Sequence, residues 1–173
     1  MLTLPVPAFA AFVLAFLGLR AWARGETPAP LLVLIGACAL QSAVVAGNQH
    51  YGLPGLAAVQ PVLALCLPPL AWVAFVATER RPLASGELWH ATIPAFGTFA
   101  WFFAPWWVLD LWIVLVFLAY GGAILWSLRG VADLAHARLG AGERPLRLWR
   151  WIGVALIVSG LMDVVIPVLL ALG

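Results

Sequence analysis

Long, nearly uninterrupted runs of apolar residues alternate with short polar stretches along the whole chain. A helix that crosses a bilayer needs roughly 20 mostly apolar residues, whereas a barrel strand shows about ten residues of alternating character. The runs in this chain are long and uniformly apolar, so they predict helices, which satisfy their own backbone hydrogen bonds in lipid. We expect six membrane spans, at 3–20, 30–47, 55–77, 88–104, 106–128 and 148–172.

The composition places the chain in a membrane. Of its 173 residues, 65% are hydrophobic and only 9% are charged, and the mean hydropathy is +1.06. A chain of this composition would not remain in solution as a water-soluble domain. We therefore predict an all-α, polytopic membrane helix bundle that forms a single domain over residues 1–173.

The arginines predict which way the bundle is inserted. The chain has no lysine, and its arginines all follow odd-numbered apolar runs. They are Arg20, Arg24, Arg80, Arg81, Arg129, Arg138, Arg144, Arg147 and Arg150. Short basic loops stay in the cytoplasm, so the amino terminus is expected outside a bacterial cytoplasmic (inner) membrane. The same rule explains the formal charge of +2 without any direct contact to nucleic acid.

Asp163 and Gln41 are two of the polar residues that fall inside the apolar runs. Asp163 lies near the middle of the sixth span, and Gln41 lies in the second. An ionisable group at this depth usually faces a bundle interior or a cavity. Asp163 is therefore expected either to act as an interhelical polar clamp, hydrogen-bonded by a residue such as Gln41, or to take part in ligand binding or signalling.

A ligand-binding site is predicted on the outer side. Polar and aromatic residues gather in the loop 47–55 and around the turn at 104–105. The candidate ligand-binding residues are Asn48, His50, Tyr51, Gln60, Trp101, Trp106 and Asp110. Aromatic walls with a few polar groups suit a small molecule. A solvated turn flanked by interfacial aromatic anchors would give the same pattern.

The sequence offers no catalytic or metal-binding pattern. Cys38 and Cys66 lie in separate apolar runs, far from a CxxC spacing, and are expected to be buried free thiols. The serines have no adjacent base, and the histidines form no metal-ligand spacing. We therefore expect no enzyme activity, no cofactor and no bound metal.

Several short strings resemble a known family. They are VQPVLALCLPPLAWVAF (59–75), LWHATIPAF (88–96), LDLWIVLVFLAYGGAIL (109–125) and WIGVALIVSGLMDVVI (151–166). Together they resemble the amino-terminal multi-span sensor region of membrane-embedded AraC-type transcriptional regulators. The matching elements are Tyr51-Gly52, Gln60-Pro61, Pro68-Pro69, His90 with Pro94, Tyr120-Gly121 and the central Asp163.

The chain also departs from that family. The resemblance implies seven spans followed by a cytoplasmic pair of helix-turn-helix motifs, whereas this sequence has six expected spans and no recognition helix. Two explanations remain open. The chain is either a truncated regulator or a stand-alone membrane sensor that acts through another protein.

The resulting functional hypothesis is a membrane-embedded sensory or ligand-binding module that signals by helix repacking. Its expected partners are membrane lipids, a small amphipathic or lipid-like ligand, and either a second copy of the chain or a separate cytoplasmic regulator. The alternatives are a small transporter or channel subunit, in which Gln41, Gln60 and Asp163 line a polar path, and a lipid-modifying membrane enzyme.

The arginine pattern makes the topology testable. Reporter fusions after Arg81 and Arg138 should read as cytoplasmic, because both follow spans that lead inward. Fusions at Gly52 and after Gly173 should read as periplasmic. A cytoplasmic signal from the fusion after Gly173 would contradict six spans with an outer amino terminus.

Overall fold

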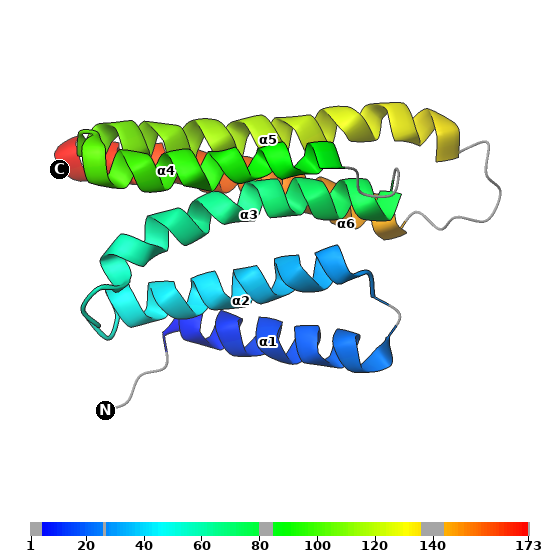
Figure 1. Cartoon of the computed structure of the whole chain (residues 1–173), viewed down its shortest axis with the longest axis horizontal. Helices are drawn as coiled ribbons and strands as arrows, with labels where there is room; N and C mark the ends of the chain where they lie inside the picture. The colour runs from blue at the N-terminus through cyan, green and yellow to red at the C-terminus, as the bar shows by residue number, and fades with distance from the viewer. Residues whose placement is uncertain (1–4, 26, 80–84, 136–143, 173) are drawn as a thin grey trace. The chain divides into compact units, whose positions relative to one another are not determined.

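The computed structural model describes residues 5–25, 27–79, 85–135 and 144–172, and every regular element within them is a helix (Figure 1). The elements in chain order are α1 (Val6–Arg24), α2 (Ala29–Gln49), α3 (Leu56–Glu79), the 3₁₀ helix η1 (Ser85–Ala91), α4 (Thr92–Phe103), α5 (Trp106–Ala135) and α6 (Arg144–Leu172). The predicted all-α fold class is confirmed for these residues.

The chain divides into two compact units, Met1–Ala104 and Pro105–Gly173. In the first unit α1 packs on α2, α2 packs on α3, and α3 packs on both η1 and α4. Figure 1 shows α1, α2 and α3 side by side in this order. The second unit is the pair α5 and α6, which pack against each other along their lengths.

Within the described residues, five helices are long and apolar enough to cross a membrane: α1, α2, α3, Trp106–Arg129 of α5 and Leu146–Val165 of α6. The fourth predicted span, 88–104, is instead divided between η1 and α4. The 12 residues of α4 cover only about 18 Å at 1.5 Å per residue. The seven residues of η1 add about 14 Å at the larger 3₁₀ rise. The two together approach the roughly 30 Å of a hydrocarbon core, so a sixth, composite span remains a prediction.

Proline explains why the fourth segment is not one regular α-helix. Pro94 is the third residue of α4, where a proline is tolerated because the first-turn N–H groups need no partner within the helix. An α-helix that continued backward would require the Pro94 nitrogen to donate to the His90 carbonyl. Proline has no N–H group, and its ring would clash with that carbonyl. The tighter η1 turns therefore precede α4.

Other helix ends follow the expected signals. Pro5 precedes α1 and Pro28 precedes α2, while Gly25 ends α1 in the left-handed region at φ 71°. A left-handed residue after the last turn is a common helix stop, and glycine adopts it without strain. Helix α5 continues beyond the expected span 106–128 to Ala135.

Helix α3 carries the core of the first unit. Its buried face includes Leu65, Pro68, Ala71 and Phe75. The prolines at 61, 68 and 69 lie inside this helix and remove three N–H donors from its backbone ladder. Figure 1 shows α3 as a bent ribbon. Buried prolines thus place the bend where α3 is most enclosed by its neighbours.

Close glycine contacts define the second unit. A Cβ atom at Gly121 would lie 2.8 Å from the Gly153 carbonyl oxygen, and one at Gly160 would lie 3.0 Å from the Phe117 Cβ. The earlier residue of α5, Phe117, thus meets the later residue of α6, Gly160, whereas Gly121 meets Gly153. The two helices are therefore antiparallel. The backbones approach closely because these positions lack side chains, as is typical of helix pairs in membranes.

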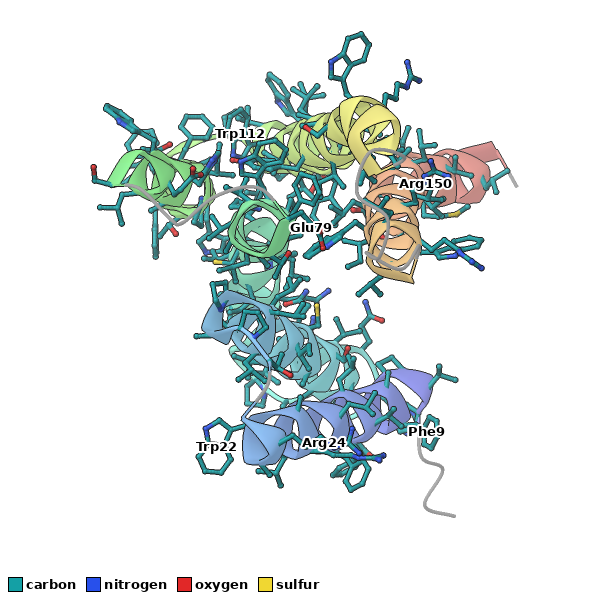
Figure 2. All side chains as sticks on the ribbon, turned by 90° about the vertical axis from the view of Figure 1, so that its right-hand side faces the viewer. Phe9, Trp22, Arg24, Glu79, Trp112 and Arg150 are labelled. Carbon is teal, nitrogen blue, oxygen red and sulfur yellow. The ribbon has the colours of Figure 1, made fainter. Side chains whose placement is uncertain are left out.

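Several tryptophans are exposed on the helix surfaces. Trp22, Trp106, Trp126 and Trp151 are all more than two-thirds exposed. In Figure 2 the side chains of Phe9 and Trp22 extend outward from α1. Trp149, in contrast, is only 2% exposed and forms part of the core.

The glycine contacts predict unequal effects of two neighbouring substitutions. Gly121→Ala should lower the free energy of unfolding in detergent by about 1–3 kcal/mol, because the new methyl group forces α5 and α6 apart. Gly122→Ala is the matched control, since its methyl group meets no atom within 4 Å. Thermal unfolding of both variants measures the difference, and equal losses would contradict the close α5–α6 contact.

Candidate functional site

A groove lies between α3 and the η1–α4 segment, with a volume of about 400 Å³. This volume falls within the usual range of small-molecule sites. Most of its lining is apolar, and it includes two ionisable side chains, Glu87 and His90. The apolar lining consists of Cys66, Pro69, Leu70, Val73, Leu88, Ala91 and Pro94.

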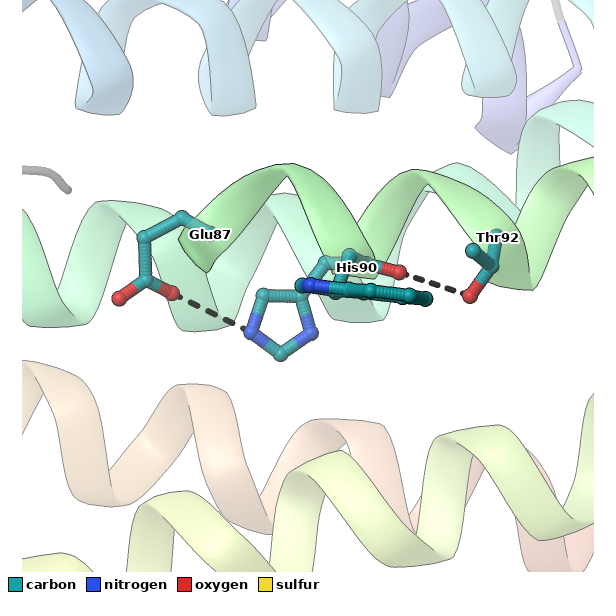
Figure 3. A network of polar contacts seen from close by, with 4 residues as sticks. Glu87, His90 and Thr92 are labelled. Carbon is teal, nitrogen blue, oxygen red and sulfur yellow. Dashed lines mark hydrogen bonds and ion pairs between the residues drawn. The ribbon is translucent and has the colours of Figure 1, made fainter. Parts of the chain in front are cut away.

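The two polar lining residues are joined to each other. The Nε2 atom of His90 lies 3.2 Å from the Oε2 atom of Glu87, as Figure 3 shows. In a 3₁₀ helix residues three apart lie on the same face, so η1 aligns this pair. The contact is an ion pair when His90 is protonated and a hydrogen bond when a neutral His90 donates from Nε2.

The pair is also held in place from both sides. The Trp72 ring of α3 meets the His90 ring edge to face, with centroids 6.4 Å apart. On the α4 side, the Thr92 hydroxyl donates to the Trp89 carbonyl oxygen at 2.7 Å, which ties the end of η1 to the start of α4 (Figure 3). The Glu87 side chain is 10% exposed and that of His90 is 28% exposed. The groove thus has one enclosed polar pair.

The α3 wall of the groove includes part of its bend. Pro69 lines the groove, and its missing N–H leaves the Leu65 carbonyl without its α-helical donor. One residue farther along, the Cys66 thiol donates to the Val62 carbonyl oxygen at 3.4 Å. The lining positions 66–73 precede the end of α3 at Glu79 by about 9–20 Å of helix. The groove therefore runs along α3 from near its polar end toward its middle.

Three of the predicted polar residues meet between α2 and α3. The Asn48 amide nitrogen donates to Gln60 Oε1 at 2.7 Å, and the Gln41 amide nitrogen donates to the Gln60 backbone oxygen at 3.3 Å. The Gln41 Oε1 atom is buried and has no hydrogen-bond partner in the described part of the chain. The structure thus brings Gln41, Asn48 and Gln60 into one polar contact between two helices.

The other predicted outer residues belong to both units. The rings of His50 and Tyr51 pack edge to face at 4.9 Å where α2 ends, and Trp101 lies on α4, 41% exposed. Trp106 and Asp110 lie on the first turns of α5 in the second unit. The outer pocket that combines all of these side chains therefore remains a prediction.

Asp163 lies on an exposed position of α6. Within the described residues no hydrogen bond to Asp163 is found, and the amides of Gln41 and Gln60 make the α2–α3 contacts given above. The clamp and the signalling roles of Asp163 both remain predictions.

One sequence signal marks the groove. Glu87 and His90 are three residues apart in the string GELWH. The expected fourth span begins at residue 88, so Glu87 lies just outside it and apolar length alone does not connect the pair. The apolar lining, in contrast, depends on how α3 meets η1, which residue spacing alone does not reveal. Among the described residues, no group of three or more His, Cys, Asp or Glu side chains could hold a metal ion.

Comparisons with protein-family models, with curated proteins and with solved structures find no match to this chain. The resemblance to sensor regions of AraC-type regulators thus remains a prediction from short motifs. The functional argument depends on the geometry of the groove.

The α2–α3 contact predicts a loss of stability when it is removed. Gln60→Leu should lower the free energy of unfolding by roughly 0.6–2 kcal/mol, because the Asn48 amide loses its acceptor, Gln60 Oε1, in apolar surroundings, whereas the backbone carbonyl that Gln41 contacts is kept. Gln49→Leu is the control, since Gln49 is exposed at the end of α2. Chemical or thermal unfolding in detergent measures both variants. A Gln60→Leu protein as stable as the control would show that the amide contact contributes nothing.

Proposed function

We propose that the chain is a membrane-embedded ligand-binding module whose groove between α3 and η1–α4 takes one amphiphile with a single long apolar chain. Binding of the amphiphile shifts the packing of these elements, and the shift is the signal. The observation that carries this proposal is the groove itself, which is almost wholly apolar and holds a single Glu87–His90 pair.

The lining indicates the chemistry of the ligand. An apolar chain gains free energy when it leaves water or replaces loosely packed lipid in a close-fitting apolar groove. A carboxylate and an imidazole in contact with this groove can exchange hydrogen bonds with a polar head such as a hydroxyl, an amide or an amine. The ligand class is therefore a single-chain amphiphile.

The position of the groove on α3 suits such a molecule. The apolar lining runs toward the middle of a helix that is a candidate span, and the end of that helix is followed by Arg80 and Arg81 in the sequence. The chain of the ligand would lie along α3, and its head would lie beside Glu87 and His90. Because short arginine-rich loops stay in the cytoplasm, the Glu79 end of α3 would be the cytoplasmic one.

The elements around the groove offer a means of signalling. A 3₁₀ helix of seven residues is unusually long, and such segments often mark hinges. Across the groove, α3 bends at its prolines. A ligand that touches both elements favours one of their arrangements over others, and this differential affinity is what a population shift requires.

The same proposal includes the finer features expected from the sequence. The module has six spans and an outer amino terminus in a bacterial cytoplasmic membrane, with η1 and α4 together as the fourth span. It passes the signal to a cytoplasmic regulator, in keeping with the resemblance to AraC-type sensor regions.

Photolabelling tests the groove directly. A long-chain alcohol with a photoreactive diazirine in its tail should label the purified protein within peptides that contain Cys66–Val73 and Leu88–Pro94. Leu70→Trp should reduce this labelling about fivefold or more, because the indole fills the groove. The labelled peptides are identified and counted by mass spectrometry.

Val59→Trp provides the control, because Val59 is 45% exposed on the same helix and does not line the groove. This variant should label like the wild type. Even labelling of all exposed helix faces, or an undiminished signal in Leu70→Trp, would overturn the proposal.

A further inference from the structure

A second hollow lies at the corner between α1 and α2, with a volume of about 330 Å³. Its lining differs in kind from that of the groove. It consists of Leu17, Arg20, Ala21, Arg24 and Thr27. Two cationic side chains and a hydroxyl thus surround a space that is small but large enough for a compact polar group.

The spacing along α1 explains the arrangement. Positions 17, 20, 21 and 24 follow the i, i+3, i+4, i+7 pattern, so they form one face of the helix. Arg20 and Arg24 are one turn apart on this face and point toward the same solvent region. Ala21 lies between them with only a methyl group. The hollow exists because a small residue is flanked by two long ones.

The turn after α1 supplies the remaining wall. Gly25 ends the helix in the left-handed region, and its N–H donates to the Trp22 carbonyl oxygen at 3.0 Å. Thr27 follows two residues later and lines the hollow, just before α2 begins at Ala29. The amino terminus of α2 adds a partial positive charge at this corner, and no acidic residue lies in its first turn.

We infer that this corner is a binding site for a phosphate group, supplied by the headgroup of an anionic phospholipid. Guanidinium groups bind phosphate oxygens through paired, charge-assisted hydrogen bonds, and two of them one turn apart can hold one phosphate between them. The Thr27 hydroxyl can donate a further hydrogen bond. The inference is independent of the groove, because it concerns other helices and another class of ligand.

Two observations favour a lipid over a free phosphoester. Leu17 lies one turn below Arg20 and gives the hollow an apolar wall on the side that leads into α1, a candidate span. Trp22, at the same end of α1, is 68% exposed and extends away from the helix near Arg24 (Figure 2). Exposed tryptophans commonly lie at the headgroup level. The phosphate would thus be held where an acyl chain can continue along α1.

The charges near the hollow affect how strongly it should bind phosphate. Glu26 is outside the described residues, but its charge belongs to the same stretch of sequence. Arg20 and Arg24 contribute +2 and Glu26 contributes −1, which leaves a net charge of +1. Glu26→Gln should therefore tighten phosphate binding.

Native mass spectrometry of the full chain in a non-ionic detergent tests the site. Short-chain phosphatidylglycerol should bind with one saturable copy, and phosphatidylcholine of the same chain length should bind more weakly. Arg20→Gln with Arg24→Gln should weaken the phosphatidylglycerol copy about tenfold or more. The double lysine variant should recover part of the loss, since lysine keeps the charge without the paired hydrogen bonds.

Arg129→Gln is the control, because Arg129 is another exposed arginine near a membrane end of a helix and lies 5.4 Å from the Trp126 ring centroid. It should leave the saturable copy unchanged. If it weakens binding as much as the double variant does, the attraction is a general surface charge effect and the site is refuted.

Competition with inorganic phosphate distinguishes a lipid headgroup from a free phosphate as the source of the bound phosphate group. A phosphate concentration that saturates ordinary phosphate sites should not displace the bound phosphatidylglycerol. Full displacement at equal affinity would overturn the lipid assignment. Loss of phosphatidylglycerol binding with intact labelling of the groove, or the reverse, distinguishes failure of this site from failure of the proposed function.

Discussion

Lipid offers no hydrogen bonds to a peptide backbone, and this constraint shapes every part of the molecule. It makes each long apolar run a helix, and it makes each interruption of a helix costly. The interruptions at the buried prolines of α3 and at Pro94 are therefore informative. They occur on the two elements that form the apolar groove, so the least regular backbone of the first unit surrounds this groove.

The two units use opposite means of packing. In α5 and α6, residues without side chains let the backbones approach closely, and a methyl group at Gly121 would strike a carbonyl oxygen. Such a contact has little freedom to change. In the first unit, α3 meets η1 and α4 through side chains that leave about 400 Å³ between them. The packing around the groove therefore costs less free energy to rearrange than the packing of α5 against α6.

The sequence was a good guide where one physical rule dominates. Apolar length predicted the long helices, whereas the structure ends α1 at Gly25, beyond the expected limit at residue 20. Gln41 and Gln60 were recognised as polar residues in apolar runs, but only the register of α2 on α3 reveals that they share a hydrogen bond. The burial of Trp149 depends on which face of α6 meets its neighbour, which composition does not say. The Glu87–His90 pair depends on a 3₁₀ turn that apolar periodicity does not predict.

The 3₁₀ geometry of η1 also has a consequence for length. A 3₁₀ helix rises about 0.5 Å more per residue than an α-helix, so the seven residues of η1 are about 3.5 Å longer than the same residues in α form. Biological bilayers differ in hydrocarbon thickness by a few ångströms. Because Pro94 disfavours the α form in this segment, η1 keeps the longer form, which suits a thicker hydrocarbon core than the same residues would span as an α-helix.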